Sequence, residues 1–143
     1  MPAIAGGLCD GLQAVRTADK RHLRISVPES LVGSVDVDST LKTAFPNAPR
    51  WDYAIGYHCS NRKVEVVYWV EIHPASDGEI KVVLTKLEWL RGWLRENANR
   101  LAALPREFIW ISSGRTSFTP SSPQRRKMAS AGLQHHGSVL RIP

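Results

Sequence analysis

The sequence contains little cysteine and no long apolar run, and both absences narrow the class of protein. Among 143 residues there are two cysteines, Cys9 and Cys59, without the paired spacing of a zinc site or a disulfide framework. A reduced, cytoplasmic setting is therefore expected. No run approaches the roughly 18 apolar residues that a membrane span needs. Residues 1–8 lack the basic leader of a signal peptide, so we expect no membrane partner.

Acidic residues are missing from the last quarter of the sequence. No aspartate or glutamate follows Glu107, so five of the six net positive charges lie beyond it. Segments with this charge bind polyanions, and nucleic acid is the first candidate. The predicted nucleic-acid contacts are Arg115, Arg125, Arg126 and Lys127. The alternative is a solubilising basic tail.

The length and composition fit one domain with a sizeable core. Hydrophobic residues make up 43% of the chain and charged residues 22%, which is ordinary for a globular protein. Proline, serine and basic residues dominate after Gly114. We therefore expect an α/β core domain over residues 1–114 and a basic, irregular C-terminal tail over 115–143, with one late strand at 139–142.

Two segments in the middle of the chain predict a β-hairpin. Residues 51–58 and 63–73 are rich in valine, isoleucine, tyrosine and tryptophan. If the loop between them has two residues, Asp52 lies opposite Glu71 on one face, with the Cβ atoms roughly 4.5–5.5 Å apart. A four-residue loop keeps both acids on one face along a diagonal. A three- or five-residue loop places them on opposite faces.

An amphipathic helix is the strongest prediction after the hairpin. Apolar residues recur at spacings of three and four over 80–101. Ser76 and Glu79 match a capping box, and Pro105 ends the helix. A further strand is expected at 107–112.

Shorter elements are expected ahead of the hairpin. Residues 8–19 have a helical apolar pattern, and residues 22–27 alternate like a strand. A short helix over 39–45 would be capped by Asp38 or Ser39.

Two carboxylates brought so close predict a bound cation. Asp52 and Glu71 would hold Mg²⁺ or Mn²⁺, which prefer oxygen ligands. Such a metal polarises a phosphoryl oxygen and lowers the pKa of a bound water. His73 faces the same way as Glu71 and could orient that water or take its proton. The alternatives are an ion pair of Asp52 with Arg50 or Arg62, a solvent-exposed Glu71 and a structural His73.

The order of helix, hairpin, long helix and strand resembles the PD-(D/E)XK nuclease superfamily. The resemblance covers roughly residues 38–112. It implies an α/β, restriction-endonuclease-like fold, with a mixed central β-sheet flanked by helices. By position, Asp52 corresponds to the motif aspartate, Glu71 to the motif glutamate and His73 to the motif lysine.

The histidine at position 73 departs from the family pattern, because a neutral imidazole is not a permanent cation. The resemblance therefore implies a lysine relocated to the next helix, either Lys81 or Lys86. We place Lys81 in the predicted catalytic set. The family's early acid would be Glu29, Asp36 or Asp38, and its first strand 22–27, with 28–50 as an insertion.

These features predict a metal-dependent nuclease-like protein that acts on phosphodiesters of nucleic acid. The alternative is a catalytically inactive module on the same fold that binds nucleic acid or protein. A third interpretation is a subunit of a larger mobile-element or defence complex. A homodimer is also compatible with the resemblance. The environment of His73 should discriminate, because contact with a metal favours the enzyme and burial against the long helix favours the binding module.

Overall fold

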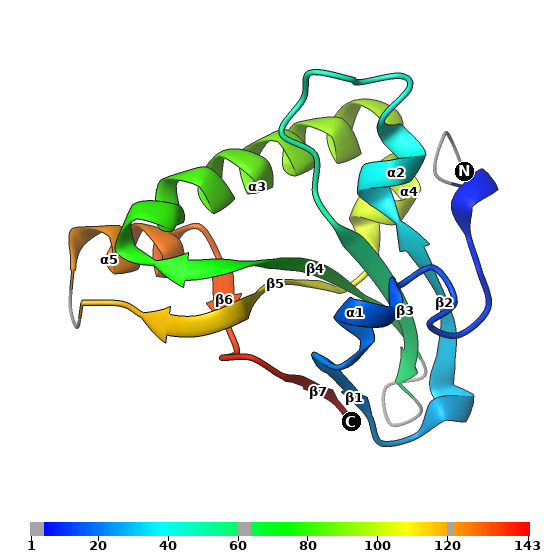
Figure 1. Ribbon diagram of the computed structural model, residues 1–143. Helices are drawn as coiled ribbons and strands as arrows, with labels where there is room; N and C mark the ends of the chain where they lie inside the picture. Colours follow the sequence, from blue (N-terminus) through cyan, green and yellow to red (C-terminus); the bar gives the residue numbers. More distant parts are fainter. Residues whose placement is uncertain (1–4, 60–63, 120–121) are drawn as a thin grey trace.

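A five-stranded mixed sheet forms the centre of the computed structural model, which describes residues 5–59, 64–119 and 122–143. The strand order is β2-β3-β4-β5-β6. The strands are β2 (Leu31–Asp36), β3 (Tyr53–Cys59), β4 (Val64–Ser76), β5 (Arg106–Ser117) and β6 (Leu133–His135). Figure 1 shows the long, twisted β4 and β5 crossing the middle of the molecule.

The direction of each strand follows from its connection. β2, β3 and β4 pair antiparallel, whereas β4, β5 and β6 pair parallel. Parallel neighbours need a crossover. Helices α3 (Asp77–Asn97) and α4 (Asn99–Ala103) join β4 to β5, and α5 (Pro123–Ser130) joins β5 to β6. The expected α/β class with a mixed central sheet packed against helices is thus confirmed.

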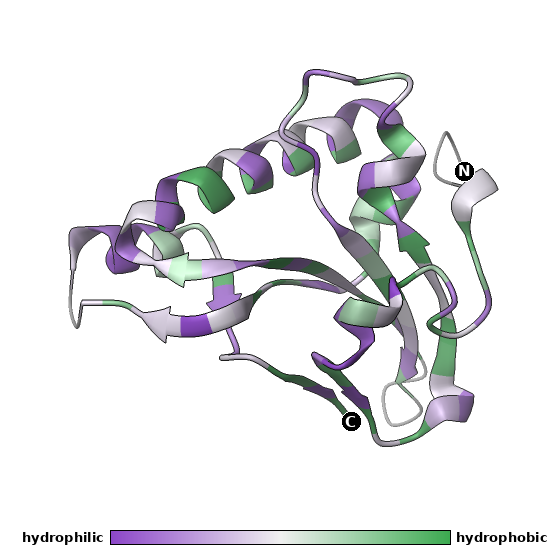
Figure 2. Cartoon of the chain, in the orientation of Figure 1, coloured by the Kyte–Doolittle hydropathy of each residue, from purple (hydrophilic) through white to green (hydrophobic). Residues whose placement is uncertain are grey.

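One face of the sheet is covered by helices (Figure 1). Val83, Leu87 and Leu90 of α3 are at most 1% exposed and pack on Trp69 and Trp110 of the sheet. Figure 2 shows hydrophobic and hydrophilic residues alternating along α3, as the spacing predicts. Helix α2 (Val37–Leu41) and Met128 of α5 complete this core.

The other face is covered by two short strands, one from the N-terminal third and one from the C-terminal end of the described chain. Strand β1 (Leu23–Ile25) pairs in parallel with β7 (Leu140–Ile142) as a separate two-stranded sheet. Their apolar residues pack on the tyrosines and isoleucines of β3, β4 and β5. The remaining short elements are the 3₁₀ turns η1 (Ala5–Gly7) and η2 (Pro28–Ser30) and the helix α1 (Thr17–Lys20).

The N-terminal third differs from the sequence prediction. Residues 8–16 form no helix, because the backbone of Cys9 exchanges two hydrogen bonds with Ser34 of the edge strand β2. Gly11, with φ of +54°, turns the chain just afterwards. The strand expected at 22–27 is β1, which lies outside the main sheet; β2 takes the place beside β3 instead.

The caps of two helices differ from the sequence prediction. Asp36, rather than Asp38 or Ser39, caps α2, because its carboxylate accepts the Ser39 backbone N–H. Ser76 is the N-cap of α3 but its side chain makes no capping hydrogen bond. Glu79, the other half of the expected capping box, binds His73 instead.

The segment expected to be irregular contains regular structure. Beyond Gly114 the chain completes β5 and then forms α5, β6 and β7. The late strand expected at 139–142 is present as β7. β6 depends on a partner far away in sequence, β5, which explains why local composition does not indicate it.

Candidate functional site

Asp52 and Glu71 lie side by side on the helix-covered face of the sheet. Tyr53 pairs with Val70 in the β3–β4 register, so the next position outward brings Asp52 beside Glu71. The Asp52 backbone N–H donates to Glu71 Oε1 at 3.1 Å, and the Ile72 N–H donates to Asp52 Oδ2 at 3.0 Å. The predicted same-face arrangement is confirmed, although residues 60–63 of the loop lie outside the described residues.

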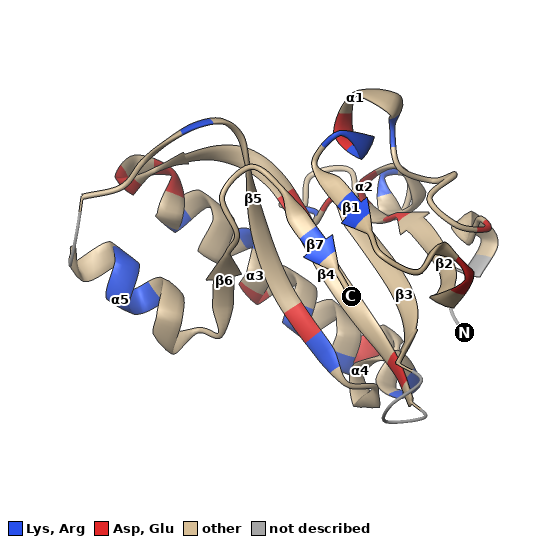
Figure 3. Cartoon of the chain, turned by 90° about the horizontal axis from the view of Figure 1, so that it is seen from below, with Lys and Arg blue, Asp and Glu red and all other residues tan. Residues whose placement is uncertain are grey.

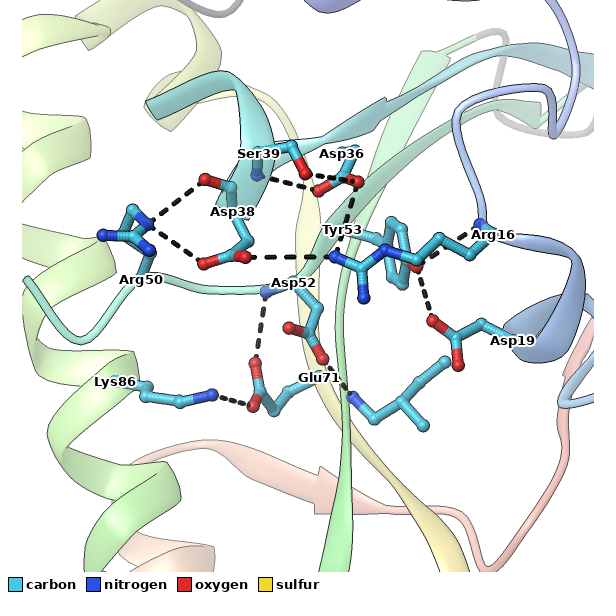
Figure 4. Close-up of polar contacts among 11 residues, drawn as sticks. Arg16, Asp19, Asp36, Asp38, Ser39, Arg50, Asp52, Tyr53, Glu71 and Lys86 are labelled. Carbon is cyan, nitrogen blue, oxygen red and sulfur yellow. Dashed lines mark hydrogen bonds and ion pairs between the residues drawn. The ribbon is translucent and has the colours of Figure 1, made fainter. Parts of the chain in front are cut away.

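Helix α3 supplies a lysine to this pair of acids. Lys86 Nζ donates to Glu71 Oε2 at 2.5 Å. Figure 4 shows Lys86 reaching from α3 toward Glu71, with Asp52 on the other side of the glutamate. Glu71 is fully buried, so the alternative of a solvent-exposed Glu71 is wrong. We call Asp52, Glu71 and Lys86 the acid–lysine site.

Burial controls the charge of the acid–lysine site. Burial, reinforced by the neighbouring Asp52 carboxylate, raises the pKa of Glu71 to about 8, against the opposing pull of Lys86. Burial also raises the pKa of Asp52. Burial alone would lower the pKa of Lys86, but the Glu71 carboxylate outweighs it, so the pKa of Lys86 is raised. The site therefore holds its protons more tightly than exposed side chains would.

A second group of charges borders the acid–lysine site. Arg50 Nε donates to Asp38 Oδ1 at 3.0 Å, and Arg16 Nη2 lies 3.6 Å from Asp36 Oδ2 and 3.9 Å from Asp38 Oδ2. Figure 4 shows these residues above Asp52, with Asp38 between the two arginines. Arg50 thus pairs with Asp38 rather than with Asp52. Arg62, the other suggested partner of Asp52, lies outside the described residues.

His73 is tied to helix α3. Its Nε2 lies 2.6 Å from Glu79 Oε2, and its Nδ1 lies 3.6 Å from Glu71 Oε2. Its ring meets the Trp110 ring edge-on at 6.4 Å. His73 therefore touches the acid–lysine site at its edge, while its closest contact is with the first turn of the helix.

Lys81 and the predicted nucleic-acid contacts lie elsewhere on the surface. Lys81 is exposed and lines a groove between α3 and α5 together with Lys127. Arg115, Arg125 and Arg126 are also exposed. Within the described residues none of these five cations forms an ion pair with Asp52 or Glu71. Lys86 is thus the lysine that the fold places in the site.

The sequence contains an indication that favours Lys86 over Lys81. Lys86 follows Val83 by three residues and precedes Leu90 by four, and both of these are fully buried. The residues three and four positions after Lys81 are Leu84, which is partly buried, and Thr85, which is exposed. The apolar stripe of α3 therefore identifies the lysine that can reach the sheet.

The oxygen atoms of the acid–lysine site suit a hard divalent ion. Asp52 Oδ1 makes no hydrogen bond within the described part of the chain, so it keeps its lone pairs for a ligand. Mg²⁺ is commonly held by one or two carboxylates, with water and phosphate oxygens filling its remaining positions. Among the described residues, no group of three or more histidine, cysteine, aspartate or glutamate side chains could hold a metal ion. An ion held by these two carboxylates would therefore take most of its ligands from solvent and substrate.

Comparisons with family models, curated proteins and solved structures each found no match for this chain. In the described part of the chain, no helix is both long and apolar enough to cross a membrane.

Proposed function

We propose that the protein is a metal-dependent nuclease-like protein that cleaves nucleic-acid phosphodiesters at the acid–lysine site. One observation carries the proposal: Asp52, Glu71 and Lys86 converge from the start of β3, from β4 and from α3. Three antiparallel strands followed by a helix and a parallel strand agree with the restriction-endonuclease-like fold that the sequence resembles. That finer fold assignment is part of the proposal.

Each residue has a distinct role in the proposed reaction. Asp52 and Glu71 would hold Mg²⁺ or Mn²⁺, which when bound would polarise a phosphoryl oxygen and acidify water. The Lys86 ammonium would orient or activate the attacking water, the role that the resemblance implies for the motif lysine. His73, at the edge of the site, would accept a proton.

The pKa of Glu71 has a consequence for metal binding. A carboxyl group must lose its proton to serve as a metal ligand. Since the pKa of Glu71 is about 8, metal binding should release protons and strengthen as the pH rises from 6 to 9. Isothermal titration with Mn²⁺ in buffers of different ionisation enthalpy measures both effects.

Two lysines on the same helix provide a matched test of the proposal. The substrates are plasmid, linear duplex and single-stranded DNA and RNA, each incubated with Mg²⁺ or Mn²⁺. We expect D52N and E71Q to abolish cleavage and K86M to reduce it by about 100-fold. K81M, which changes an exposed lysine five residues away, should stay within about twofold of wild type. Cleavage that persists in both D52N and E71Q would disprove the site assignment.

A second candidate function is supported by the contacts of Lys86 and His73. Lys86 already supplies a cation to Glu71, and His73 is engaged by Glu79. A buried carboxylate whose charge is balanced by a lysine needs no metal. This arrangement fits an inactive module that binds nucleic acid. The same assays distinguish the two functions. The module would bind nucleic acid in a salt-sensitive way without cleaving it, and D52N would leave its binding unchanged.

A further inference from the structure

The two ends of the described chain bring a pair of arginines together. β1 and β7 have the same sequence, Leu-Arg-Ile, and pair in parallel and in register. Arg24 is therefore the direct partner of Arg141, although the two are far apart in sequence. Figure 3 looks onto this side of the molecule and shows a basic residue on each of the two adjacent strands.

Both arginines face solvent. The leucines on either strand are buried against the sheet, whereas Arg24 and Arg141 are exposed. Arg24 Nη1 donates to the backbone carbonyls of Arg21 and Leu23, each at 2.9 Å, which holds its guanidinium near the exposed Arg21. Within the described residues, none of these three arginines forms an ion pair with an acid.

A bound anion would stabilise this pair of arginines more than it would stabilise most surface charges. Like charges placed directly opposite each other on paired strands repel. Neighbouring strands lie about 4.7–4.9 Å apart, so two guanidinium groups can approach one phosphate. Arginine binds phosphate oxygens through paired N–H donors. The nearest acid along the chain, Asp19, already accepts a hydrogen bond from Tyr53.

We propose that Arg24 and Arg141, with Arg21 beside them, form a phosphate-binding surface for nucleic acid on the face of the sheet opposite the acid–lysine site. We call these three residues the arginine face. The choice of ligand rests on the proposed function and on the net charge of +6. Two of its three residues lie outside the basic segment that the sequence indicates, because Arg21 and Arg24 belong to the N-terminal third.

Binding without metal tests the arginine face separately from catalysis. Fluorescence anisotropy with labelled single-stranded and duplex oligonucleotides is measured in EDTA between 50 and 200 mM salt, roughly the range over which phosphate contacts weaken most visibly. We expect R24Q/R141Q to weaken binding about tenfold or more. The slope of log K against log salt should fall in magnitude by about one to two, since each phosphate contact contributes about 0.9.

Matched controls separate this surface from net charge and from the acid–lysine site. R95Q/R100Q removes two exposed arginines from α3 and α4 and should weaken binding about twofold at most. Because EDTA removes divalent metal, this binding does not depend on the acid–lysine site, so a failed nuclease proposal leaves this result intact. Equal losses in the two arginine double variants would overturn the arginine face, as would binding to anionic vesicles but not to oligonucleotides.

A charge reversal provides an independent readout. R24E places an acid opposite Arg141, which relieves the repulsion between the strands. We therefore expect R24E to raise the melting temperature while it weakens oligonucleotide binding. A variant that loses both stability and binding would show that Arg24 has only a structural role.

Discussion

At the scale of single residues, Glu71 links the stability of the fold to pH. Its pKa rises from 4.5 in the unfolded chain to about 8 in the folded protein. A raised pKa means that the folded state holds the proton more tightly. This contribution to stability is complete below about pH 4.5 and is lost as the pH rises toward 8.

We therefore expect the free energy of unfolding to fall by about 2–4 kcal/mol between pH 5 and pH 8.5 through Glu71. E71Q should remove this dependence, because an amide does not titrate in this range. Denaturant unfolding at five pH values measures the effect. E65Q is the matched control, since Glu65 is an exposed acid on the same face of the same strand. If E71Q retained the wild-type slope, the titration would belong to another group.

The central contact of the site was predictable from the sequence, and its surroundings were not. The alternation of side chains in a hairpin fixes which face Asp52 and Glu71 share once the loop length is chosen. The contact between Glu79 and His73 could not be predicted from the sequence, because Glu79 fits a capping box equally well. Arg16 meets Asp38 only through tertiary folding, so no local pattern indicates that pair.

At the scale of elements, the N-terminal segment protects the edge of the sheet. Cys9 and Ser34 exchange backbone hydrogen bonds, which cover part of the outer side of β2. Gly33 permits this close approach. A Cβ atom at Gly33 would lie 2.7 Å from the Cys9 carbonyl oxygen and 2.9 Å from Leu8 Cδ1.

G33A should therefore destabilise the protein by about 1–3 kcal/mol, because the backbone of the N-terminal segment must move. The matched control is G78A. A Cβ atom at Gly78 meets nothing within 4 Å and lies in the first turn of α3, so this change should raise stability by up to about 1 kcal/mol. Urea denaturation of both variants provides the measurement. Similar small effects in the two variants would contradict the close approach at Gly33.

Elements with a strong internal pattern were the easiest to predict. The hairpin strands and α3 bury side chains at regular spacings, and the sequence shows the same periodicity of apolar residues. The segment over 8–16 has a helical pattern too, but the backbone of its Cys9 pairs with Ser34 of β2 instead. β6 is three residues long and exists because β5 lies beside it.

At the scale of the whole molecule, the C-terminal segment is part of the core. Leu140 and Ile142 are at most 2% exposed and pack with Leu23 and Val15 beneath the sheet. Leu133 and Met128 belong to the core on the helical face. The residues after Gly114 thus contribute to both hydrophobic cores, which composition alone did not indicate.

We expect I142A to cost about 2–4 kcal/mol and to shift the entire unfolding transition. Circular dichroism, which reports the helices, and tryptophan fluorescence, which reports the core between α3 and the sheet, should move together. V139A, at a partly buried position, should cost less than about 1 kcal/mol. If I142A left the main transition in place, residues 115–143 would fold as a unit separate from the core domain.

The pairing of β1 with β7 also affects how the chain folds during its synthesis. During synthesis, Leu23 of β1 has no partner strand until Leu140 of β7 has left the ribosome. During that interval the lower side of the sheet remains uncovered, and its tyrosines and isoleucines are open to other nascent chains. Slow translation through the final third would prolong this exposure, so synthesis speed should influence the yield of native protein.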